Sequence, residues 1–333
     1  MTRSAAQMAV VGATTPVDRL RFEQGVSREL VHKAAVEQVL VTDFVELGEL
    51  EFASAGQAPR AHAYFNDAIA PHYDALMMLE SGRQAFVTAA HAMVDVPRAS
   101  QFTFVGVDLQ VERLDALRLG AEPASLVWCA RLIGPRILRG EPVGAGAVGE
   151  LLIDGVRCAA ITGVGVFMSE RMYRILRRRP HGLPDEAPVG TGARLSPAAV
   201  GRRDPANVVI GELEHRDGAL HTGVVVDRSH TTFFDHPLDH VPAMLLVEAL
   251  RQTAVVAVAQ THGLRPEALH LSRVDVKYHR YAELDGRIGC AATAGAVLQR
   301  GQTRDVQVDV QLHQGSATLA AGRLTLSFEG DTA

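Results

Sequence analysis

Two stretches of the chain are apolar around nearly the whole circumference of a helix. Residues 73–93 and 242–260 are each long enough for roughly five or six turns, and a helix of this kind is buried on most sides. Each is followed by four segments of alternating or β-branched residues separated by Gly and Pro, which predicts strands. The predicted strands are 102–111, 124–132, 146–153 and 157–168, then 269–278, 287–297, 303–313 and 317–328, with shorter ones at 38–42, 208–211 and 220–226.

The second half of the chain repeats the first. The helical motif Glu80-x-x-Arg83-Gln84 returns as Glu248-x-x-Arg251-Gln252, displaced by 168 residues. At the same offset, and without gaps, His62, Phe65, Asp67 and His72 fall on His230, Phe233, Asp235 and His240. A repeat of this length indicates two copies of one structural unit that complete each other by packing together.

One long buried helix followed by four antiparallel strands describes the hotdog fold, in which a curled sheet wraps the helix. We therefore predict an α+β protein with two tandem hotdog domains that form an internal pseudo-dimer, the whole chain being a monomer or a homodimer. The predicted divisions are a flexible arm at 1–29, a first domain at 30–170, a basic Pro- and Gly-containing linker at 171–198 and a second domain at 199–330.

Composition narrows the class of protein. Hydrophobic residues make up 47% and charged residues 21% of the 333 residues, as in ordinary soluble proteins. We find no apolar run of the ~18 residues needed to cross a membrane and no secretory signal, so the expected location is the cytoplasm. A net charge of -5 gives no field to attract nucleic acid. Three cysteines without CxxC spacing indicate buried thiols.

The repeated helical motif is the first candidate for chemistry. Glu80, Arg83 and Gln84 stand at i, i+3 and i+4, and therefore share one face of an otherwise apolar helix. Buried charges must be paired, bind a ligand or line a cavity. A structural ion pair is one interpretation. The same motif on both helices favours the other, a functional site, because buried titratable groups in clefts are frequent there.

The loop before the second helix is the other candidate. Pro237 and Pro242 exclude a helix across it. His236 and His240 are four residues apart, which places two metal ligands together only on a helix, and no third ligand is evident, so we predict no metal. His236 is instead a candidate acid or base. Because the first repeat carries Ala68 at this position, the two clefts are expected to differ, with one of them catalytic.

Residues 233–253 resemble the active-site region of hotdog β-hydroxyacyl-acyl-carrier-protein dehydratases, with His236 at the place of the catalytic histidine and Glu248 at that of the helix carboxylate. The chain departs from them in lacking His-Phe-Pro-Gly. The tandem duplication, Val31-His32-Lys33 and the motif His62-x-Tyr64-Phe65-Asn66-Asp67 are more similar to the A-factor biosynthesis (AfsA-type) family. That family comprises actinobacterial synthases of γ-butyrolactone, butenolide or furan autoregulators.

The resemblance implies an acyltransferase without a cofactor. Such an enzyme joins a β-ketoacyl group, delivered as a thioester on acyl carrier protein, to the hydroxyl of dihydroxyacetone phosphate. We expect Glu80 or Glu248, with a pKa raised by burial, to act as general base. His236 is expected opposite Glu80, and His72 with Asp67 opposite Glu248 and Arg251. The expected substrate-binding residues are Arg83, Arg251, Gln84, Gln252, His72, His240, Asp67 and Asp235.

Two other classes of function remain open at this point. A dehydratase or thioesterase uses the same fold, with water in place of the phosphorylated alcohol in the second case. A non-catalytic protein that binds acyl ligands is the other class, for which Ala68 in place of a histidine reflects lost activity.

Overall fold

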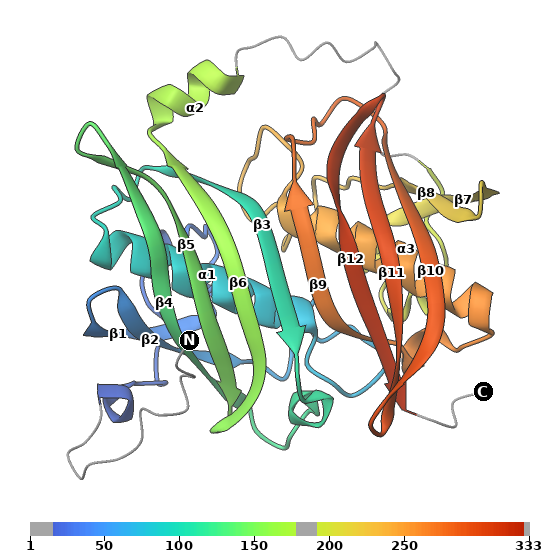
Figure 1. Ribbon diagram of the computed structural model, residues 1–333, viewed down its shortest axis with the longest axis horizontal. Coiled ribbons are helices and arrows are strands. Elements are labelled where there is room, and N and C mark those ends of the chain that lie inside the picture. The colour runs from blue at the N-terminus through green and yellow to red at the C-terminus, as the bar shows by residue number, and fades with distance from the viewer. Residues whose placement is uncertain (1–15, 178–191, 330–333) are drawn as a thin grey trace.

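The tandem hotdog prediction is confirmed by a computed structural model, which describes residues 16–177 and 192–329 (Figure 1). One curved antiparallel sheet runs across both repeats, and both core helices lie against the same face of it. The first repeat consists of β1 (Val41–Gly48), β2 (Glu51–Ala58), α1 (Ala75–Met93), β3 (Gln101–Val111), β4 (Ala124–Leu138), β5 (Glu141–Ile153) and β6 (Val156–Met168). The second consists of β7 (Ile210–Arg216), β8 (Ala219–Val224), α3 (Ala243–His262), β9 (His270–Tyr278), β10 (Ile288–Arg300), β11 (Thr303–Gln314) and β12 (Ala317–Glu329).

The two repeats join at the middle of the sheet. The strand order is β1-β2-β4-β5-β6-β3-β9-β12-β11-β10-β8-β7, so β3 and β9 form the seam. Their antiparallel register runs from Gly106 opposite Lys277 to Gln110 opposite Arg273. A single repeat would leave β3 or β9 as an open edge, and the duplication closes that edge with the other copy.

Loops also cross from one repeat to the other. The Asp235 carboxylate accepts hydrogen bonds from the backbone N–H groups of Ala34 at 2.7 Å and Ala35 at 2.9 Å. In the equivalent contact of the other repeat, Asp67 accepts a hydrogen bond from the backbone N–H of Asp204 at 3.0 Å. These two aspartates, expected to bind substrate, therefore anchor the loop of each repeat to the start of the other.

The sequence predictions differ from the structure at the edges. Each repeat has two strands before its helix, and β2 was not predicted. Residues 36–38 form a 3-10 turn, so the first strand begins at Val41 rather than at residue 38. In the predicted arm, Pro16–Arg19 and Arg28–Val31 are also 3-10 turns, while residues 1–15 lie outside the described part.

The predicted linker begins with a helix, α2 (Glu170–Arg177), that packs on the second repeat. Arg177 fixes it there, because its guanidinium pairs with the Glu283 carboxylate at 2.6 Å and with Asp239 at 3.0 Å. The same guanidinium lies 4.9 Å from the centre of the Tyr281 ring. The rest of the linker, up to residue 191, lies outside the described part.

The expectation that no apolar segment has membrane-spanning length was wrong for α3. By length and composition Ala243–His262 is able to cross a membrane, but 72% of its most apolar window is buried inside the protein. The core helix of a hotdog domain has this composition because the sheet surrounds it.

Candidate active site

Glu80 lies at the centre of a buried network on α1. Arg83, one turn further on, donates two hydrogen bonds of 2.8 Å to its carboxylate, from Nε and Nη2. The Lys33 ammonium is 3.0 Å from Oε1, and the Gln84 amide donates to the same oxygen at 2.9 Å. Arg83 also reaches the carbonyl of Val31 at 3.3 Å. We call Lys33, Glu80, Arg83 and Gln84 the Glu80 network.

Glu248 has a corresponding network on α3 with more partners. Arg251 donates to its carboxylate from Nε at 2.8 Å, and Arg202 from Nη2 at 3.1 Å. The Tyr64 hydroxyl, which comes from the first repeat, donates to Oε2 at 2.8 Å. Asp74 adds a second carboxylate, 3.1 Å from Arg202 and 3.6 Å from Arg251. Together with Gln252, these residues form the Glu248 network.

Lys33 and Arg202 are equivalent residues of the two repeats. Both follow a 3-10 turn and a residue with positive φ, which is His32 at 56° in the first repeat and Gly201 at 71° in the second. They are 169 residues apart, one more than the offset of the helices. The gap-free comparison therefore pairs Lys33 with Gly201 and gives no sign that each glutamate has a second basic partner.

Two substitutions make the networks unequal. Asp74, the residue before α1, corresponds to Pro242 before α3, so the Glu80 network has no second carboxylate of this kind. Tyr64 corresponds to Thr232, whose buried hydroxyl has no hydrogen-bond partner among the described residues. Among the described residues, the Glu248 network therefore pairs two arginines with two carboxylates, while Lys33 and Arg83 are in ion-pair contact with Glu80 alone and Asp235 acts on them from further away.

The expected general-base pKa is wrong for both glutamates. Burial acts to raise the pKa of Glu80, but the charges of Arg83 and Lys33 and the hydrogen bonds outweigh it and hold that pKa well below its ordinary value. For Glu248, burial is likewise outweighed by Arg202 and Arg251, which lower its pKa to about 2. Both groups are therefore carboxylates at neutral pH, and each of their oxygens already accepts at least one hydrogen bond.

His236 stands at the edge of the Glu80 network. Its Nδ1 is 3.3 Å from the Asp235 carboxylate, and its side chain is 44% exposed. Asp235 also acts electrostatically on Arg83, which places this loop of the second repeat beside α1 of the first. The ring therefore has one nitrogen oriented by a carboxylate and the other turned away from it, as a general base requires.

An apolar pocket of about 80 Å³ opens beside Arg83. It lies between α1, the sheet of the first repeat and the start of α3. Its lining residues are Leu79, Gly82, Arg83, Phe86, Phe104, Val107, Ala147, Ile161, Gly163, Ala243, Met244 and Tyr278. Arg83 is the one charged side chain among them, so this pocket suits an apolar chain whose polar end lies near the Glu80 network.

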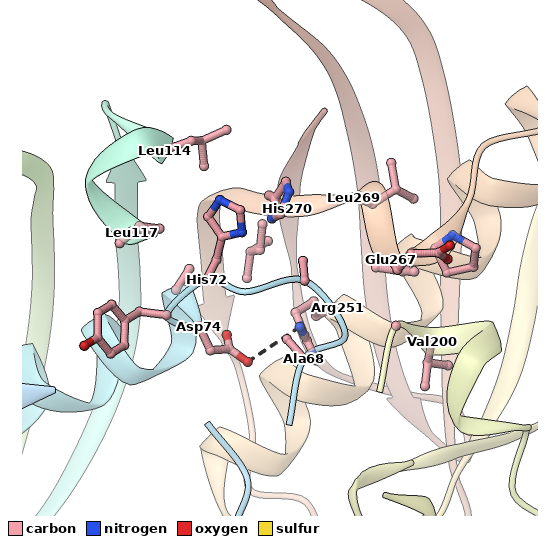
Figure 2. Close-up of a pocket in the computed structure, with 17 residues that line it drawn as sticks. Ala68, His72, Asp74, Leu114, Leu117, Val200, Arg251, Glu267, Leu269 and His270 are labelled. Atoms are coloured by element: carbon pink, nitrogen blue, oxygen red, sulfur yellow. Dashed lines mark ion pairs between the residues drawn. The ribbon is translucent and has the colours of Figure 1, made fainter. Parts of the chain in front are cut away.

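A second cavity of about 50 Å³ lies beside Arg251 (Figure 2). His72 and His270 lie side by side in its lining with ring centres 4.5 Å apart, and the ion pair of Asp74 with Arg251 lies at another side. Burial lowers the pKa of His270 to about 4. The expected partner of His72, Asp67, instead accepts backbone hydrogen bonds, so the two do not form a common site.

The remaining predicted residues serve the fold. Gln84 accepts from the N–H of Leu40 at 2.8 Å and donates to a backbone carbonyl, and Gln252 holds the N–H of Val209 in the same way at 2.9 Å. His240 is 2.7 Å from Asp239. No group of three or more His, Cys, Asp or Glu in the described ranges is arranged to hold a metal ion.

Comparison with known proteins agrees with this architecture. The profile of the A-factor biosynthesis hotdog domain (AfsA) matches residues 14–169 and 185–329, once in each repeat. A 2-oxo-3-(phosphooxy)propyl 3-oxoalkanoate synthase of Streptomyces virginiae is 33% identical over 301 residues, covering 88% of this chain and 95% of that protein. A protein of the same name from Streptomyces griseus is 34% identical, covering 87% and 92%.

Solved structures share the fold at low sequence identity. A putative oleoyl thioesterase from Lactobacillus plantarum superposes with a TM-score of 0.52 at 12% identity, covering 86% of this chain and 99% of that one. The 12:0-ACP thioesterase from Umbellularia californica gives 0.51 at 13%, covering 83% and 94%. The protein is thus a tandem hotdog protein with two unequal buried Glu–Arg networks. Within that class, the chain belongs to the A-factor biosynthesis hotdog family.

Proposed function

We propose that the protein is an acyltransferase that joins a β-ketoacyl group, delivered as a thioester on acyl carrier protein, to the primary hydroxyl of dihydroxyacetone phosphate. The names of its relatives describe that product, a 3-oxoalkanoate ester of a phosphooxy ketone. The first step of γ-butyrolactone or butenolide biosynthesis follows from it. Because acyl carrier protein is a cytoplasmic donor, we place the reaction in the cytoplasm.

We assign catalysis to the Glu80 network. The observation that carries this assignment is that Lys33 and Arg83 are in ion-pair contact with one carboxylate, Glu80, while Asp235 acts on both from further away and Arg83 lines the apolar pocket. Arg202 and Arg251, in contrast, share two carboxylates, Glu248 and Asp74. A phosphate needs uncompensated cationic donors, and a guanidinium offers them in a planar fork. Glu80 then orients Lys33 and Arg83, and does not take the proton.

His236 is the proposed general base. Its Nε2 takes the proton of the acceptor hydroxyl while that oxygen attacks the thioester carbonyl carbon, and Asp235 stabilises the imidazolium. The carbon–sulfur bond then breaks, and the proton passes to the departing thiolate. Ala243 and Met244, in the first turn of α3, line the apolar pocket. Their backbone N–H groups suit the oxyanion, because first-turn amides have no partner within a helix.

The test is mass spectrometry of the protein incubated with a β-ketoacyl thioester and dihydroxyacetone phosphate. Wild type is expected to form the phosphorylated ester. His236→Gln is expected to lose about a hundredfold or more in kcat, as for loss of a general base, while the matched change His72→Gln in the second cavity leaves the rate near that of wild type. Free acid without an ester would establish a thioesterase instead. Equal losses in both variants would remove the assignment to the Glu80 network.

A further inference from the structure

A pair of histidines lies next to the Glu80 network, since His32 precedes Lys33 and interacts electrostatically with Arg83. The Nε2 atoms of His32 and His91 are 3.0 Å apart, and His91 Nδ1 is 2.7 Å from the carbonyl oxygen of Val96. A carbonyl oxygen only accepts, so His91 carries its proton on Nδ1 when it is neutral. Its Nε2 is then an acceptor, and His32 must donate from its own Nε2.

The backbone beside the pair favours an additional proton. Neutral His32 has placed its proton on Nε2 and has none on Nδ1. The backbone of Arg98 acts to raise the pKa of His32, so it stabilises the protonated ring. Two rings with their Nε2 atoms 3.0 Å apart can share one additional proton between them.

The surroundings of the pair lower the pKa of both rings. Burial, followed by His91, Arg83 and His236, lowers the pKa of His32 to about 4, and burial and Arg98 lower the pKa of His91. The ring of Phe102 covers His32 edge-on at 4.9 Å. The charged and titratable groups that face the pair or its immediate neighbours are Arg83 and Glu80 on α1, Lys33 on the N-terminal segment, Arg98 after α1, and Asp235 and His236 on the loop of the second repeat.

We propose that His32 and His91 take up one proton when the acceptor phosphate binds at Lys33 and Arg83, and so supply a third positive charge to the acceptor site. A phosphate dianion beside Arg83 offsets the cationic charge that now disfavours protonation of His32, and attracts the new charge directly. The backbone of Arg98 favours the protonated His32 ring in the same step. The inference rests on the proposed function, because it names what the acceptor site does when its phosphate arrives.

The second repeat has no such pair. His32 corresponds to Gly201, and the residue 168 positions after His91 is Ala259. Both His32 and Gly201 have a positive φ, a backbone conformation that glycine adopts freely and histidine adopts at a cost. A histidine is thus held in an unfavourable conformation in the repeat to which we assign catalysis, and its place is taken by glycine in the other.

The experiment is titration calorimetry of the whole protein with dihydroxyacetone phosphate and no acyl donor, near neutral pH, in two buffers of different ionisation enthalpy. Wild type is expected to take up protons on binding. A phosphate bound to cations is itself driven toward its dianion, which releases protons, so the sign of the exchange separates the two sources. His32→Asn is the main variant, because asparagine tolerates a positive φ and does not titrate. It is expected to bind about tenfold more weakly and without proton uptake.

His91→Gln provides a second variant with the same expected loss of uptake, and His270→Gln, an equally buried histidine of the second cavity, is the matched control that keeps it. Binding by wild type with no uptake, or with release, would overturn the inference and leave the acceptor site standing. Uptake that persists in both His32→Asn and His91→Gln would overturn it as well. Absence of binding by wild type would overturn the acceptor site itself.

Discussion

Asp74 and Pro242 occupy the same position before the two core helices, and this single difference sets the charge of each network. Asp74 accepts a hydrogen bond from the backbone N–H of Leu76 and forms ion pairs with Arg202 and Arg251. Pro242 begins α3 without a side-chain cap. One aspartate therefore both caps a helix and adds a second carboxylate to the Glu248 network, and the lack of its counterpart is why we assign the acceptor phosphate to the Glu80 network.

Pro242→Asp is expected to abolish most of the activity without weakening the fold. Aspartate is a better helix N-cap than proline, so the free energy of unfolding should stay constant or rise by up to about 1 kcal/mol. The new carboxylate would occupy Lys33 and Arg83 as Asp74 occupies their counterparts, and the loss of charge-assisted bonds to phosphate should lower kcat/KM for the acceptor about ten- to a hundredfold. Steady-state kinetics and thermal denaturation of the same sample check the predicted activity and the predicted stability. Unchanged kcat/KM would contradict the role of Lys33 and Arg83.

Acid should weaken the fold through the buried glutamates. The pKa of Glu248 is about 2 in the folded protein against 4.5 for the free group, so its carboxylate stabilises the fold above pH 4.5 and this stability is lost as the pH falls toward 2. The shift corresponds to about 3 kcal/mol. Urea denaturation between these pH values should show Glu248→Gln less stable than wild type at the upper end, and the gap closing toward the lower end. Parallel curves would contradict the prediction.

The sequence predicted which charged residues are buried together better than it predicted their pKa values. The repeated motif identified Glu80, Arg83 and their twins, but a raised pKa was expected because the second basic partners were unknown. Lys33 and Arg202 lie on a segment with an offset of 169, so the comparison without gaps missed their equivalence. Tyr64 has Thr232 as its counterpart, and a dissimilar pair leaves no signal of repetition.

At the scale of elements, the core helices were predicted to within two residues at each end because their apolar character is continuous. β2 was missed for a local reason. Its sequence, Glu51–Ala58, consists largely of Ala, Gly and Ser, which produce neither alternation nor β-branched enrichment. It becomes a strand through pairing on both sides, with β1 and β4, which is tertiary information.

The elements that enclose the apolar pocket should determine which acyl group is accepted. Phe104 on β3 lines the pocket and contacts Phe86 of α1 with ring centres 5.7 Å apart. Phe104→Ala enlarges the pocket, and should raise the kcat/KM of longer thioesters relative to shorter ones by about tenfold or more. Competition between thioesters of increasing length measures this ratio. Phe44→Ala, whose ring stacks on Phe52 away from the pocket, should leave the ratio unchanged, and an equal shift in both variants would rule out Phe104 as a determinant.

At the scale of the whole molecule, the two repeats should unfold together. The seam of β3 and β9 and the loop anchors at Asp67 and Asp235 join them within one sheet. Scanning calorimetry is therefore expected to give one transition whose calorimetric and van't Hoff enthalpies agree. Two resolved transitions would show that each repeat is stable alone, contrary to the shared seam.

The covalent connection between the repeats also decides what a single mutation can do. In a homodimer of identical hotdog subunits, one codon encodes the same residue in both sites, so a substitution in one site is necessarily present in the other. Here Asp74 and Pro242 are separate codons. A mutation can therefore change the network to which we assign catalysis without changing the other network.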